Sequence, residues 1–130
     1  MPLEDLVVSG AELDRELVAT VLAPLARLDG DARRVLFLPG WDKLNNERKI
    51  LAYLVGRKAM RALEWVEEEG VLPRQVSLDT GLPGGSVRPS LGRLVDGRLV
   101  AQAGEGRYVV PNWAMNRVRE VLTDSTKQED

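Results

Sequence analysis

Arginine is the residue type in this sequence whose chemistry is easiest to place. Between residues 72 and 110 the net charge is +2, from Arg74, Arg88, Arg93, Arg98 and Arg107 against Asp79, Asp96 and Glu105. Residues 1–43 instead carry a net charge of −3, in a chain of 130 residues whose total is −2. A planar guanidinium binds phosphate oxygens and can bind guanine through two hydrogen bonds. The bias permits contact with nucleic acid, although nucleic-acid binders usually carry a stronger positive excess.

The residue types that are missing narrow the chemistry further. The sequence contains no cysteine and no histidine, which excludes disulfides, thiol nucleophiles, thiolate metal sites and the commonest general base. A metal site would need carboxylates alone, and no carboxylate pair stands out in a position for acid–base catalysis. We therefore expect neither an enzyme nor a bound cofactor or metal.

The length and the start of the chain indicate a compartment and a domain count. Residues 1–5 lack the basic and apolar regions of a signal peptide. No apolar run approaches the roughly 20 residues that are needed to span a bilayer. We expect a cytoplasmic protein with no membrane contact, whose length suits one domain with its own hydrophobic core.

Two short helices and a turn are expected to position the arginines. The first helix begins near Leu72 and ends at Gly81, and a turn through residues 82–85 follows it. A second helix is predicted by apolar residues at helical spacing, which are Val87, Leu91, Leu94 and Val95. Gly97 is expected to close this helix in a left-handed conformation, which glycine adopts without strain.

Two strand-like runs come after the second helix. Residues 98–103 and 107–110 are joined by Gly104, Glu105 and Gly106, a short-hairpin signal. A helix, a tight turn, a helix and a hairpin within about 40 residues form the layout of a helix-turn-helix with a wing.

This segment resembles the winged helix-turn-helix superfamily. The resemblance lies in the spacing of apolar and turn residues and covers roughly a third of the chain: Val76-Ser77-Leu78, Thr80-Gly81-Leu82-Pro83, Ser86-Val87-Arg88, Leu91-x-x-Leu94, Gly97-x-Leu99-Val100 and Gly106-Arg107-Tyr108. It implies that the second helix enters the major groove of double-stranded DNA and that the wing contacts the backbone or minor groove. By position, the DNA-binding residues would be Ser86, Arg88, Ser90 and Arg93, with Arg107 at the wing and Arg74 near the start of the first helix.

The resemblance implies a DNA-binding transcriptional regulator, and many such proteins are homodimers that match paired half-sites. The amides of Gly84, Gly85 and Ser86 would offer a phosphate contact at a helix N-terminus. The exposed face of the second helix also fits another role, because its outermost positions are expected to be Pro89, Gly92, Arg93 and Asp96. The alternative is a winged-helix protein–protein interaction module in a larger assembly, without direct DNA contact. Pro89 fits only if the helix begins near Ser86.

The sequence predicts an α+β fold, mainly α, as a single domain over residues 1–122. Its parts are an N-terminal helix and short strand (1–43), a long central helix (44–70), the helix-turn-helix plus wing (71–111) and a C-terminal helix (112–122). Residues 123–130 are expected to form a flexible tail.

The N-terminal part is expected to begin its helix at Ser9 and Glu12, which fit a capping box. Apolar residues between Leu13 and Leu28 recur at near-helical spacing, but Pro24 should break the helix near Ala23. Residues 33–38 form a short β-prone run. Trp41 and Trp113 are each expected to be buried, with an exposed partner-binding role as the alternative.

The central helix is expected to be capped by Asn45 or Asn46 and to run to Glu69, where Gly70 stops it. It is apolar around most of its circumference, which predicts burial on more than one side and part of a subunit interface. Lys58 lies among the apolar positions and is expected to reach solvent by extending its stem. The C-terminal helix would pack on the monomer or pair with a second copy. A small-molecule effector pocket between the N-terminal part and the central helix is left as an open alternative, although no residue constellation points to one.

Overall fold

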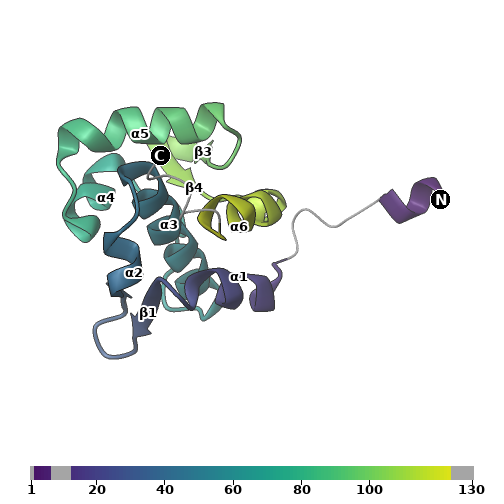
Figure 1. Ribbon diagram of the computed structural model, residues 1–130, viewed down its shortest axis with the longest axis horizontal. Helices are drawn as coiled ribbons and strands as arrows, with labels where there is room; N and C mark the ends of the chain where they lie inside the picture. Colours follow the sequence, from purple (N-terminus) through teal and green to yellow (C-terminus); the bar gives the residue numbers. More distant parts are fainter. Residues whose placement is uncertain (1, 7–12, 124–130) are drawn as a thin grey trace.

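The computed structural model describes residues 2–6 and 13–123. The fold is α+β and mainly helical, as the sequence predicts, with two small antiparallel sheets (Figure 1). The elements in chain order are η1 (Leu3–Leu6), α1 (Arg15–Leu22), β1 (Ala26–Asp29), β2 (Arg34–Phe37), α2 (Pro39–Asp42), α3 (Asn46–Ala62), α4 (Pro73–Thr80), α5 (Gly84–Asp96), β3 (Ala101–Ala103), η2 (Gly104–Gly106), β4 (Arg107–Val109), η3 (Asn112–Ala114) and α6 (Met115–Thr123).

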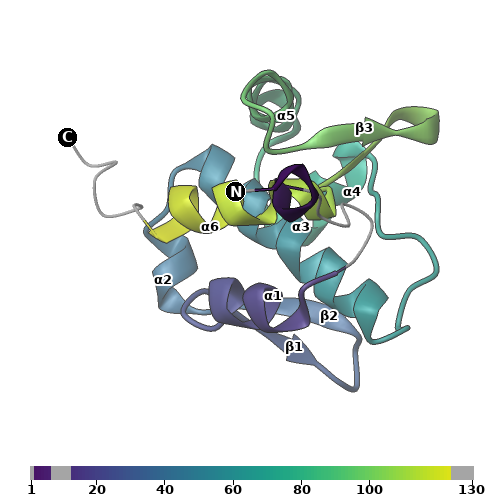
Figure 2. The same ribbon diagram turned by 90° about the vertical axis from the view of Figure 1, so that its right-hand side faces the viewer.

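Helix α3 forms the centre of the molecule. Asn45 caps it, because its side-chain oxygen accepts a hydrogen bond from the Arg48 amide at 2.9 Å. Figures 1 and 2 both place α5 at one end of the molecule and α1 with β1 at the other, with α3 between them. Residues 50–55 are all at most 1% exposed. The predicted burial on several sides is therefore confirmed, and these side chains are not available for a subunit interface.

The C-terminal end of α3 differs from the prediction. The helix stops at Ala62 rather than at Glu69, because Glu64 takes a left-handed conformation with φ +62°. The amide of Trp65 then donates to the Met60 carbonyl at 2.9 Å, and the amide of Glu64 donates to the Arg61 carbonyl at 3.0 Å. These two bonds form a Schellman cap. The reversal packs the half-buried Trp65 against the core.

The N-terminal part contains one strand more than expected. Helix α1 ends at Leu22, and Ala23 caps it directly before Pro24, which confirms the predicted break. The chain then forms β1, which pairs antiparallel with β2 so that Ala26 lies opposite Phe37. Leu28 accordingly belongs to a strand and not to a helical stripe. The predicted capping box of Ser9 and Glu12 lies outside the described residues.

Helices α4 and α5 follow the predicted order, with two differences at the ends of α5. Gly81 ends α4 with φ +79°. Helix α5 begins at Gly84, two residues before the expected start at Ser86. Pro89 therefore lies inside the helix. Proline has no amide hydrogen, and the carbonyl of the exposed Gly85, four residues earlier, therefore lacks its helical donor.

The C-terminal end of α5 also corrects the sequence interpretation. Gly97 has an ordinary φ of −79°, whereas Arg98 takes the left-handed conformation with φ +62°. The amide of Leu99 donates to the Leu94 carbonyl at 3.0 Å and closes a second Schellman cap.

The predicted hairpin is present as β3 and β4, joined by η2. Ala101 lies opposite Val109, and Ala103 lies opposite Arg107. Val71 adds a bridge to this sheet, because it exchanges two backbone hydrogen bonds with Tyr108, at 3.0 and 2.8 Å. The segment before α4 is thereby fixed to the hairpin after α5.

Helix α6 packs back onto the same chain. Its buried residues Met115, Val118 and Leu122 belong to the common core, and the Arg48 guanidinium donates to the Val121 carbonyl at 3.3 Å. Of the two expected arrangements, packing on the monomer is therefore the one observed. Thr123 is the last residue of α6, and the rest of the predicted tail, residues 124–130, lies outside the described residues.

Candidate nucleic-acid interface

The apolar stripe of α5 faces the core as its spacing predicts. Val87 and Leu91 are fully buried and Leu94 nearly so. The opposite face is exposed and consists of Gly84, Gly85, Arg88, Pro89, Gly92, Arg93 and Asp96. The four outermost positions expected from the sequence all lie on this face, which carries two arginines and one aspartate.

Arg88 and Arg74 are the predicted site residues that are both exposed and unengaged among the described residues. Arg88 lies in the first half of α5, and Arg74 is the second residue of α4. Both are exposed, and neither makes a hydrogen bond or ion pair with the described residues. Their guanidinium groups are thus available for a ligand.

Arg93 is exposed but already engaged. Its Nε lies 2.9 Å from Oε2 of Glu47, in the first turn of α3. The two side chains are 58% and 38% exposed, and an ion pair of that kind contributes only about 0–1 kcal/mol to stability. A phosphate could therefore replace Glu47 at little cost.

The structure contradicts the expectation that Ser90 faces DNA. Ser90 is 0% exposed, because it follows Val87 by three residues and precedes Leu94 by four, which places it within the apolar stripe. Its Oγ accepts a hydrogen bond from Arg93 at 3.4 Å. The spacing of Ser90 from Val87 and Leu94 is therefore enough to predict its burial from the sequence. Ser86 is half-buried and so only partly accessible.

Arg107 is placed in the hairpin, as expected, but it is half-buried at the start of β4. Its guanidinium donates one hydrogen bond, to the Gly70 carbonyl at 3.3 Å. The exposed tip of the hairpin carries Glu105, with φ +64°. The Tyr108 ring packs against the core, and its hydroxyl accepts a hydrogen bond from Gln102 at 2.8 Å.

The N-terminus of α5 keeps two amides without an acceptor among the described residues. The N-cap residue is Pro83, which offers no side-chain cap. Its carbonyl accepts from the amides of Ser86 and Val87 at 2.9 and 3.2 Å. The amide of Ser86, expected to be free, is thus occupied, and those of Gly84 and Gly85 remain for an anion.

Arg98 is exposed directly after α5 and is a further candidate for the interface. The sequence pattern did not indicate it, because Gly97 was expected to be the residue that ends the helix. A second polar region, missed as well, is a cavity of about 480 Å³ between β2, α3 and α4, lined in part by Arg33, Arg34, Arg57 and Gln75.

The buried Tyr53 is another of the residues that line this second cavity. Its hydroxyl donates a hydrogen bond to Asp79 of α4, and Asp79 also accepts from Gln75 at 3.0 Å. Burial, together with the adjacent Asp79 carboxylate, raises the pKa of Tyr53 far above its ordinary value. The tyrosine therefore stays protonated and links α3 to α4.

Of three side chains that the sequence placed outside the interface, two are revised and one is confirmed. Lys58 does not reach solvent but is buried in an ion pair with Glu69. Trp41 is buried as predicted, with its indole N–H donating to the Lys49 carbonyl at 3.0 Å. Trp113, in contrast, is 59% exposed, contrary to the expected burial.

The described residues contain no group of acidic side chains that could hold a metal ion. Across the same ranges, 2–6 and 13–123, none of the helices has the length and apolar character that crossing a membrane requires.

No protein-family model matches the sequence, and neither curated proteins nor solved structures match it.

Proposed function

We propose that this protein binds duplex DNA through α5 and acts as a transcriptional regulator. The proposal is supported by the order of α3, α4, α5 and the β3–β4 hairpin, with Val71 paired to the hairpin, because this is the order of elements that a winged helix-turn-helix requires. In that superfamily, the helix in the position of α5 lies in the major groove.

The observation that carries the proposal is the unengaged guanidinium of Arg88 on the exposed face of α5. Arg88 lies shortly after Gly84 and Gly85 in the same helix, and the amides of these two glycines have no capping acceptor among the described residues. A guanidinium in this position can bind guanine in the groove or a phosphate at its edge. Amides at a helix N-terminus favour phosphate.

The proposed interface differs from the one expected from sequence. It keeps Arg74, Arg88 and Arg93, and it gains Arg98. It excludes Ser90, which is buried, and Arg107, which is half-buried beside the hairpin tip. The acidic tip of the hairpin at Glu105 disfavours a phosphate contact there, so α4 and α5 would supply most of the binding.

A double substitution tests this interface. Arg88→Ala with Arg93→Ala is expected to weaken duplex binding at least tenfold, because each good arginine–base pair is worth about 1–3 kcal/mol. The matched control is Arg117→Ala with Arg119→Ala, which removes the same charge from exposed positions of α6. Equal weakening by both double variants would contradict a specific role for α5.

The second candidate is a protein–protein interaction module. It is favoured by three exposed residues of α5. Pro89 and Gly92 have no long side chain and leave the exposed face flat, and Asp96 makes its C-terminal end acidic. Gly92→Arg separates the two candidates. An added cation strengthens duplex binding if this face meets phosphates, whereas a face that packs only on protein gives no duplex binding in either form.

A homodimer remains part of the proposal, as two copies on paired half-sites. The buried side chains of α3 cannot form the contact between the two copies. Among the aromatic residues, the exposed Trp113 is the one best placed to form it. Sedimentation velocity of Trp113→Ser against the unchanged protein tests this, with loss of a dimer as the expected result.

A further inference from the structure

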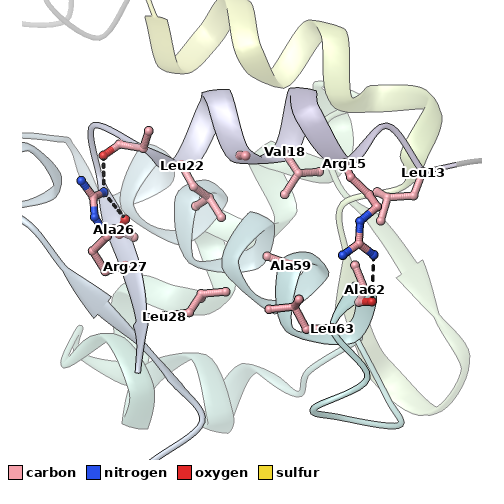
Figure 3. A pocket seen from close by; sticks show the side chains of 12 residues that line it. Leu13, Arg15, Val18, Leu22, Ala26, Arg27, Leu28, Ala59, Ala62 and Leu63 are labelled. Atoms are coloured by element: carbon pink, nitrogen blue, oxygen red, sulfur yellow. Dashed lines mark hydrogen bonds between the residues drawn. The ribbon is translucent and has the colours of Figure 1, made fainter. Parts of the chain in front are cut away.

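An apolar groove with a volume of about 400 Å³ lies between α1, β1 and the end of α3 (Figure 3). Five of the twelve residues that line it are alanines, whose small side chains leave the space open. The alanines are Ala19, Ala23, Ala26, Ala59 and Ala62. Ligand sites for small molecules typically have volumes of about 300–1,000 Å³ and mostly apolar walls.

Within the described residues, the charged side chains that line the groove are those of two arginines. Arg15 and Arg27 lie at opposite ends of it, as Figure 3 shows. The Arg15 guanidinium donates to the Ala62 carbonyl at 3.0 Å, and one nitrogen of the Arg27 guanidinium donates to the Ala23 and Ala26 carbonyls, at 2.5 and 2.8 Å. Among the described residues, neither is paired with a carboxylate. Two positive charges therefore border an apolar space to which the described part of the chain adds no neutralising acid.

We propose that this groove binds an amphipathic carboxylate, a small molecule with an apolar body and one carboxyl group. The apolar walls from α1, β1 and α3 would cover the body. One of the two guanidinium groups would take the carboxylate through paired hydrogen bonds, a geometry that arginine supports. The proposed site lies at the end of the molecule opposite α5 (Figures 1 and 2) and is independent of the proposed DNA interface.

Calorimetric titration of the full chain with decanoate tests the proposal in the absence of DNA. Decanoate is expected to bind, and decylammonium, which has the same apolar chain and the opposite charge, is expected not to. Arg15→Gln with Arg27→Gln should weaken decanoate binding at least tenfold, because hydrogen bonds to charged groups are strong. Arg117→Gln with Arg119→Gln, on α6, is the control for the lost charge.

A second pair of variants tests the groove itself. Ala19→Phe fills the space from an exposed position of α1, and it should abolish decanoate binding. Thr20→Phe adds the same ring beside it, at an exposed residue outside the groove, and should leave decanoate binding unchanged.

Four outcomes would overturn the proposal. These are no decanoate binding, equal binding of decylammonium, binding only after removal of residues 1–12, and self-association that Ala19→Phe abolishes while decanoate does not bind. The third outcome would mean that the chain's own N-terminal residues fill the groove, and the fourth that a second copy does. Since no DNA is present, these results do not depend on the proposed function.

Discussion

Lys58 and Glu69 form an ion pair inside the protein, with 3.0 Å between Nζ of Lys58 and Oε2 of Glu69. The Lys58 side chain is 3% exposed, and that of Glu69 is 18% exposed. Nζ also donates to Oδ1 of Asn112 at 2.6 Å. Through one ammonium group, α3 is fixed to the segment before α4 and to the start of the C-terminal helical region.

Replacing Lys58 is expected to destabilise the fold strongly. Lys58→Met should lower the free energy of unfolding by about 3–5 kcal/mol, because it removes the ion-pair partner of the buried Glu69 carboxylate and leaves only the weaker effects of Arg57 and Arg61. Urea denaturation measures the loss. Adding Glu69→Gln to Lys58→Met should restore part of it, and a double variant no more stable than Lys58→Met would contradict this explanation.

The same pair gives an unusual pH dependence. Burial raises the pKa of Glu69 above its usual value of 4.5, although the Lys58 charge opposes the shift. A carboxyl whose pKa is raised on folding contributes more stability when protonated, and this contribution is lost as the pH rises through the raised pKa. On acidification from pH 7 towards the usual pKa of the carboxyl, the unchanged protein should therefore gain stability relative to Glu69→Gln. A relative loss would show that the ammonium outweighs burial.

Two helical glycines should respond oppositely to alanine. A Cβ at Gly92 would meet nothing within 4 Å, so Gly92→Ala should stabilise α5 by about 0.5–1 kcal/mol through lower backbone entropy in the unfolded chain. A Cβ at Gly56 would lie 2.6 Å from Cγ2 of Val35, and Gly56→Ala should destabilise the contact of β2 with α3. Thermal unfolding compares the two, and a shift of the same sign in both would refute the packing argument.

Arg98 should show opposite effects on stability and on DNA binding. Its left-handed backbone costs a non-glycine residue about 1 kcal/mol, so Arg98→Gly should raise the free energy of unfolding by about that amount. Removal of the exposed guanidinium should weaken duplex binding at the same time. Chemical denaturation and duplex titration measure the two effects, and unchanged binding would remove Arg98 from the proposed interface.

The sequence predicts most of the helical framework, because local spacing and caps determine it. The inward stripe of α5, the end of α4 at Gly81, the cap at Asn45 and the break before Pro24 all follow from adjacent residues. Ser90 was within reach of the same reasoning, since its spacing from Val87 places it on the buried face.

The remaining features depend on contacts between distant residues. The four residues of β1 become a strand only because β2 pairs with them. Residues 63–69 contain neither glycine nor proline, and nothing local stops a helix there. Arg57 instead holds the Glu68 carbonyl at 2.6 Å, and Lys58 holds Glu69, so that tertiary contacts determine where α3 ends. Likewise, the engagement of Arg93 by Glu47 joins residues from separate helices.

The most direct test of the proposed function is binding of the full chain to a labelled mixed-sequence DNA duplex across a salt series. With three or four arginines at the interface, the logarithm of the association constant should fall with the logarithm of the salt concentration, with a slope of about −3. Arg88→Ala should reduce that slope by about 1. No binding at low salt, or binding whose salt dependence is unchanged by Arg88→Ala, would contradict DNA binding through α5.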